Sequence, residues 1–73
     1  MGTKHDDPCL KKAADDEPLF VLRATDSTAP TVVCLWILLA GTMGAPTWKL
    51  EEARQLVRRM HDWQREHGCK VPD

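Results

Sequence analysis

Arg23 is the residue whose type and position best suit the binding of an anion. It lies in the segment LFVLRAT, residues 19–25, among apolar neighbours. A guanidinium group presents a fork of N–H donors that matches a phosphate or a carboxylate. Asp26 follows three residues later, so either Asp26 or an anionic ligand neutralises Arg23. An arginine on an ordinary strand is more often solvated or paired, and the sequence leaves both interpretations open.

Three tryptophans are many for a chain of 73 residues. Aromatic rings near arginines are typical of sites that stack a base. Tryptophan is also a main residue of cores and interfaces, and Trp36 and Trp63 lie at apolar positions that favour this second role. Trp48, at the start of a predicted helix, is the best candidate for an exposed contact. The predicted ligand-binding residues are Arg23, Asp26, Trp48 and Arg58.

Zinc-ligand residue types occur in two terminal pairs, His5 with Cys9 and His67 with Cys69. Joined, they would supply a Cys₂His₂ set, but their spacing matches no standard zinc pattern, which favours two unliganded ends. The chain has no glycine-rich phosphate loop, no H-E-x-x-H and no nucleophile elbow. We therefore predict no metal, no cofactor and no enzymatic activity.

The order of polar and apolar segments predicts a strand followed by two helices. Residues 1–17 are predominantly charged and polar and predict a flexible tail, since such a segment buries too little apolar surface to fold. Residues 19–25 alternate in the manner of a strand, with Phe20 and Leu22 on one face and Arg23 on the other. The predicted strand-helix-helix domain covers residues 18–68, and residues 69–73 form a C-terminal tail.

Turn and capping residues place the two helices. Asp26, Ser27 and Thr28 are good N-cap types and Pro30 suits a first turn, so the first helix is predicted over residues 29–43. The second begins with Thr47 as its N-cap and ends at Gly68. Its apolar residues follow the 3, 4, 7 spacing of an amphipathic helix. The first helix is apolar around its whole circumference, which a short chain cannot bury by itself.

Size and pairing together predict self-association. Chains this short bury only about 60% of their unfolded surface, and three cysteines without regular spacing make no disulfide framework. The lone strand has no second strand in its own chain. We therefore predict a mainly α fold, a short N-terminal strand followed by a helical hairpin (βαα), completed by homo-oligomerisation as a dimer or larger assembly. The predicted interface residues are Phe20, Leu22, Leu35, Trp36, Leu39 and Trp63.

The charge and hydropathy of the chain indicate which partners and which cellular location to expect. A net charge of −1 supplies no general attraction to nucleic acid or to an anionic membrane. The longest apolar run, VVCLWILLA over residues 32–40, is far shorter than the about 20 residues that span a bilayer. The sequence does not open on a signal peptide. We expect the protein in the cytoplasm, not in a membrane.

The stretch DDEPLFVLRATDSTAPTVVCLW resembles small, mostly uncharacterised proteins of bacteriophages and prophages. The likeness rests on a DEPxFVLRAxDxxAP…W pattern and extends to EEARQLVRRMHDW. It implies an accessory protein acting in a bacterial host against immunity. Such a protein would sequester a nucleotide-like anionic signal or block a host defence protein.

The strand-helix-helix order is also similar to ribbon-helix-helix repressors, whose paired strands enter the major groove of DNA. Leu19 and Val21 are poor base readers, and the acidic residues 15–17 precede the strand where phosphates would lie. DNA is therefore the less favoured partner. A plain interaction subunit without a small ligand is a third interpretation.

Overall fold

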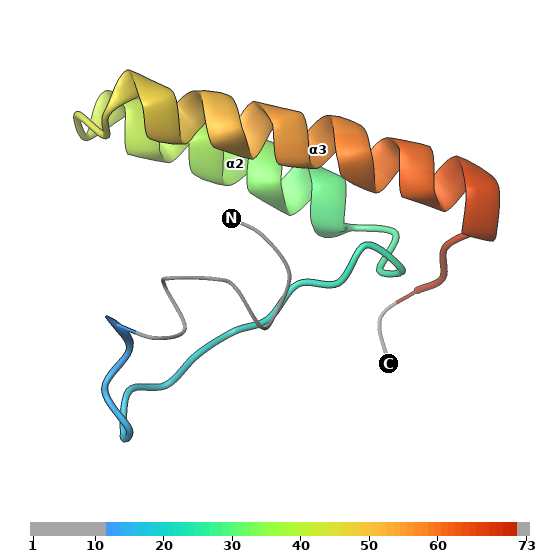
Figure 1. Cartoon of the computed structure of the whole chain (residues 1–73), viewed down its shortest axis with the longest axis horizontal. Helices are drawn as coiled ribbons and strands as arrows, with labels where there is room; N and C mark the ends of the chain where they lie inside the picture. Colours follow the sequence, from blue (N-terminus) through green and yellow to red (C-terminus); the bar gives the residue numbers. More distant parts are fainter. Residues whose placement is uncertain (1–11, 72–73) are drawn as a thin grey trace.

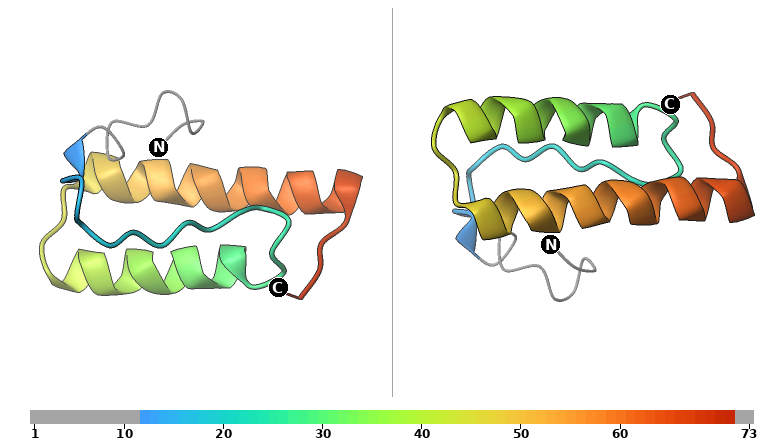
Figure 2. Two further views of the ribbon diagram at one scale, coloured as in Figure 1. Left: turned by 90° about the horizontal axis from the view of Figure 1, so that it is seen from below. Right: turned by 90° about the horizontal axis from the view of Figure 1, so that it is seen from above.

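The computed structural model describes residues 12–71, and its regular elements are two helices that form an antiparallel hairpin (Figure 1). Helix α2 spans Ala29–Thr42 and helix α3 spans Thr47–His67. The N-terminal segment runs along one side of the hairpin, between the two helices when viewed from below or above (Figure 2). The mainly helical fold class and the helical hairpin are thus confirmed.

The helix boundaries follow local chemistry closely. Pro30 occupies the first turn of α2, where its missing N–H costs no hydrogen bond. Helix α2 ends one residue before the predicted Met43, and Gly44 then turns the chain at φ +88°, a conformation that favours glycine. Helix α3 has Pro46, not the predicted Thr47, at its N-cap. It ends as predicted at Gly68, whose N–H donates to the Gln64 carbonyl at 2.7 Å.

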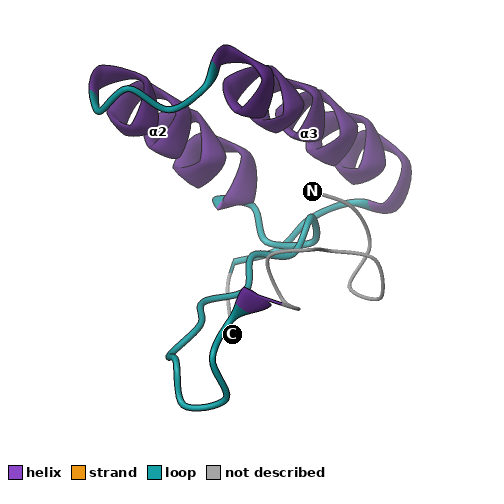
Figure 3. Ribbon diagram, turned by 60° about the vertical axis from the view of Figure 1, so that its left-hand side comes forward, coloured by secondary structure: helices purple, strands orange, loops and turns teal. Residues whose placement is uncertain are grey.

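No strand forms within residues 12–71, and residues 18–23 have no regular secondary structure (Figure 3). The predicted strand over residues 19–25 is therefore not formed within one chain. The physical reason is that a single strand has no second strand in its own chain with which to form backbone hydrogen bonds. The one β-bridge in this part of the chain is parallel and joins Asp26 to Lys70.

The segments assigned to tails are partly structured where the structure describes them. Residues 14–17 form a turn, closed by a hydrogen bond of 3.0 Å from the Glu17 N–H to the Ala14 carbonyl. After α3, the Lys70 N–H donates to the Thr25 carbonyl at 2.9 Å, and the Lys70 carbonyl accepts from Ser27 at 2.8 Å. The chain after Gly68 is therefore tied to the turn that precedes α2. Residues 1–11, most of the predicted N-terminal tail, lie outside the described residues.

The core of the hairpin is small. Its buried residues are Ala29, Val33, Ala53 and Met60. Partly buried side chains from both helices and from the N-terminal segment pack around them, namely Leu22, Ala24, Ile37, Leu56 and Val57. Two of the four buried residues are alanines, which let the helices approach closely. No large side chain in the described residues is fully buried, so the core contributes little burial energy.

Candidate functional site

Arg23 is exposed and lies in the turn that leads into α2. Its carbonyl accepts a hydrogen bond of 3.0 Å from the Asp26 N–H. The Asp26 carboxylate faces the other way along the chain, since Oδ1 accepts from the Thr28 N–H at 2.8 Å and from the Thr28 hydroxyl at 2.7 Å. No ion pair of Arg23 occurs among residues 12–71. Asp26 therefore stabilises the helix start and does not neutralise Arg23 there.

Gln64 fixes this turn to the C-terminal half of α3. Its side-chain amide donates to the Ala24 carbonyl at 2.9 Å and to the Asp26 carbonyl at 3.0 Å. Both bonds are partly buried and link residues about 40 positions apart in sequence. Together with the bridge from Lys70, they set the position of the Arg23 backbone relative to the hairpin. A glutamine carries no distinctive sequence signal, so its role was not predicted.

Trp48 and Arg58 do not join Arg23 in one chain. Trp48 lies in the first turn of α3, 65% exposed, whereas the Arg23 turn is held at Gln64. Sixteen residues separate Trp48 from Gln64 along the helix, which corresponds to about 24 Å. Arg58 is exposed between the two. A ligand that contacts both Arg23 and Trp48 would therefore have to bind Arg23 of one copy and Trp48 of another.

A different aromatic pair lies at the Arg23 end of the hairpin. The rings of Trp63 and His67 stack, with centroids 4.4 Å apart, one turn apart on the last part of α3. They flank Gln64, which holds the Arg23 turn, and Lys70 follows three residues after His67. The sequence analysis predicted Trp63 as an interface residue and did not predict its stacking on His67. The i,i+4 spacing of Trp63 and His67 was the available signal.

Two of the zinc-type residues can be placed. His67 and Cys69 are exposed, and His67 Nδ1 lies 3.1 Å from the Trp63 carbonyl oxygen. Within residues 12–71, no group of three or more histidine, cysteine, aspartate or glutamate side chains is close enough to hold one metal ion. His5 and Cys9 lie outside the described residues.

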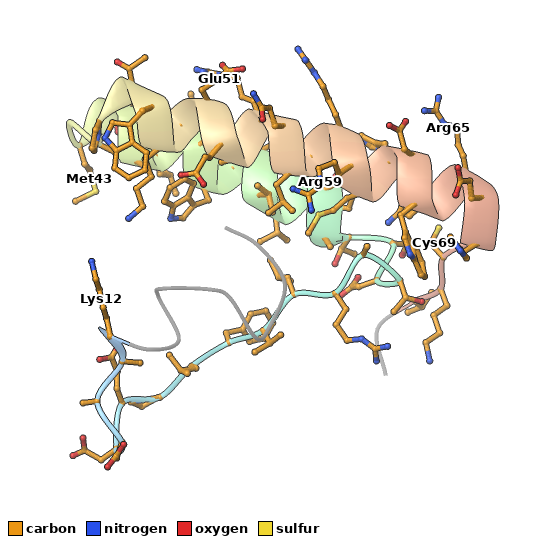
Figure 4. All side chains as sticks on the ribbon, in the orientation of Figure 1. Lys12, Met43, Glu51, Arg59, Arg65 and Cys69 are labelled. Carbon is orange, nitrogen blue, oxygen red and sulfur yellow. The ribbon has the colours of Figure 1, made fainter. Side chains whose placement is uncertain are left out.

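The second feature of the surface is an uncovered apolar face. Large apolar side chains stay exposed on both helices and on the N-terminal segment, namely Leu19, Phe20, Val21, Val32, Leu35, Trp36, Leu38, Leu39, Met43, Trp48 and Trp63. Phe20 is 85% exposed and Met43 86%. Figure 4 shows the Met43 side chain on the side of the hairpin that faces the N-terminal segment. Large apolar side chains gathered at the surface of a soluble protein mark interaction sites, so these residues indicate an interaction surface.

Most of the predicted interface residues belong to this exposed set. Phe20, Leu35, Trp36, Leu39 and Trp63 are exposed, and only Leu22 packs against the core. Their burial in a single chain is thereby excluded, while their role in an assembly stays a prediction. Helix α2 is apolar all round, but α3 covers only one side of it. No helix in the described part of the chain is long and apolar enough to cross a membrane.

Comparison with known proteins adds no relative: no family profile, no curated protein and no solved structure matches this chain. The likeness to phage proteins therefore stays a prediction from the residue pattern. Functional inference rests on the Arg23 turn and on the exposed apolar face.

Proposed function

We propose that the protein is a non-catalytic, homo-oligomeric binding module that sequesters a small nucleotide-like anion. The observation that supports it most is the state of Arg23. Its guanidinium is exposed and forms no ion pair within residues 12–71, while the nearest carboxylate, that of Asp26, accepts hydrogen bonds from Thr28. Of the two ways to neutralise Arg23 that the sequence left open, this arrangement favours a ligand.

The surroundings of Arg23 suit a phosphate attached to an aromatic group. A guanidinium binds phosphate oxygens through two parallel N–H bonds. The Trp63 and His67 rings, at the same end of the hairpin, supply stacking surface of the kind that binds bases. Gln64 and Lys70 hold the turn that carries Arg23 in place. Binding therefore costs little conformational entropy for ordering this turn.

Homo-oligomerisation completes the proposal. A second copy would bury the exposed apolar face, and residues 19–25 would pair with the same segment of that copy as strands. Trp48 and Arg58 would then come to the anion from a neighbouring copy. In this proposal the protein acts in the cytoplasm of a bacterial host, as the likeness to phage proteins implies, and removes a signal of host immunity.

The test is the Arg23→Ala variant beside the wild type. We expect one class among cyclic dinucleotides and ADP-ribose derivatives to raise the melting temperature of the wild type, since a ligand at 100 times its Kd stabilises by about 2.7 kcal/mol. Without ligand, Arg23→Ala should have the same melting temperature and the same assembly as the wild type. The ligand should no longer raise the melting temperature of this variant. Calorimetric titration of both proteins with the same compounds measures the affinity.

Arg54→Ala is the matched control, because Arg54 is also exposed but pairs with Glu51 at 3.3 Å on the same helix. An exposed pair of this kind contributes only about 0–1 kcal/mol, so the control should bind like the wild type. The proposal is wrong if no anion stabilises the wild type, or if Arg23→Ala binds the stabilising anion with unchanged affinity.

A second candidate function is the blocking of a host defence protein, which the exposed apolar face favours. It predicts a stable complex with such a protein that survives Arg23→Ala and is lost when the apolar face is made charged. Gel filtration of the purified pair distinguishes the two functions, because a nucleotide-binding module needs Arg23 and a protein-blocking module does not.

A further inference from the structure

Four exposed residues of α2 lie in a single row along the helix. Val32, Trp36, Leu39 and Met43 follow each other at spacings of four, three and four residues, and we call them the α2 seam. This is the spacing of the a and d positions through which helices pack knobs into holes. In the single chain the seam is only partly covered, since Val32 is 38% exposed, Trp36 40%, Leu39 62% and Met43 86%. The row is therefore built for a helix that the single chain does not supply.

We propose that a second copy of the chain covers the seam, with the two α2 helices packed antiparallel about a two-fold axis between Trp36 and Leu39. This inference rests on the homo-oligomerisation proposed above and names its surface. The row reads the same in both directions about its centre, so Trp36 of one copy meets Leu39 of the other. Val32 meets Met43 in the same way. A two-fold interface requires self-complementarity of this kind.

The charge of α2 favours its own copy over a charged partner. The segment APTVVCLWILLAGT contains no acidic or basic residue, so a charged partner helix would find nothing on it to pair with. Two copies, by contrast, bring no like charges together. Their antiparallel arrangement also places the positive end of each helix dipole beside the negative end of the other.

The N-terminal segment adds a second contact in this arrangement. Figure 1 shows it leaving the hairpin progressively between the start of α2 and residue 15, with the far end well separated from the helices. Leu22 and Ala24 pack on the core, while Phe20 is 85% exposed and Val21 71%. Phe20 and Val21 are therefore available to contact a second copy beside the seam.

The exposed area matches what a dimer needs. The side chains counted here are the four of the seam, Leu35 of the same helix and Trp48 at the start of α3. If each whole side chain has an area of about 200 Å², the exposed area of these six side chains is roughly 700 Å². A stable interface buries about 800 Å² on each partner. Phe20 and Val21 supply the remainder.

Two neighbouring leucines provide a matched test. Leu38 is 64% exposed and Leu39 62%, on the same helix, but only Leu39 belongs to the seam. We expect sedimentation to show wild type and Leu38→Glu in the same assembly, whereas Leu39→Glu raises the dissociation constant about 30-fold or more, as for a central interface residue. Circular dichroism of Leu39→Glu should stay helical, because the new charge is solvated in the single chain.

Met43→Glu serves as a second variant, because Met43 is 86% exposed at the end of α2 and its charge cannot disturb the core. It should also weaken the assembly. If both seam variants assemble like the wild type, the seam is not the interface, although homo-oligomerisation stands. If sedimentation shows only monomers of the wild type at the highest concentration tested, both the seam and homo-oligomerisation are wrong.

Discussion

Ala53→Asp should unfold the protein. Ala53 is completely buried at the contact between α3 and α2, beside Val33 and the other core residues. A carboxylate there has no partner, and an uncompensated buried charge costs about 3–5 kcal/mol. The whole domain has a stability on the order of 4–10 kcal/mol at this length. Because the core cluster contains only four buried residues, its other contacts cannot compensate for a loss of this size.

The measurement is thermal unfolding followed by circular dichroism. Gln55→Asp is the control, since Gln55 is exposed two residues further along the same helix and the substitution introduces the same carboxylate. Gln55→Asp should melt within a few degrees of the wild type, and Ala53→Asp should show no cooperative transition. If Ala53→Asp melts cooperatively near the wild type, the packing of α2 against α3 described above is wrong.

Gln64→Ala should release the turn that carries Arg23. The substitution removes both hydrogen bonds from the side-chain amide to the Ala24 and Asp26 carbonyls. The partly buried Ala24 carbonyl then loses its partner, and the Asp26 carbonyl keeps only the bond from the Ala29 N–H. Leaving a buried acceptor unsatisfied costs about 1–3 kcal/mol. We expect faster hydrogen exchange at the Ser27 and Lys70 amides, whose bonds to Lys70 and Thr25 depend on the same arrangement.

Gln55→Ala is the control for this prediction. Both substitutions replace an α3 glutamine by alanine and gain the same helix propensity, but Gln55 is exposed and Gln64 is not. The difference in unfolding free energy between the two variants therefore reports the contacts of Gln64. Equal stabilities and equal exchange at Ser27 and Lys70 would show that Gln64 does not hold the turn.

The sequence by itself determined the helices and the smallness of the core. Pro30, Gly44 and Gly68 mark helix ends through backbone conformations that other residues adopt poorly, so these boundaries could be predicted within a residue or two. The apolar circumference of α2 also indicated a helix that its own chain cannot cover. Both conclusions depend on local chemistry, which a sequence displays directly.

The tertiary structure decided which residues stand together at the candidate site. Arg23 and Trp48 suit the same ligand by type, yet the length of α3 separates them, and Trp63 with His67 takes the place at the Arg23 end. The role of Asp26 was open until its carboxylate was placed on Thr28. Gln64 could not be predicted at all, because its partners are backbone carbonyls 38 and 40 residues away, and any side chain with a donor could have reached them. Contacts of this kind depend on how the N-terminal segment folds back onto α3, and no local pattern records that path.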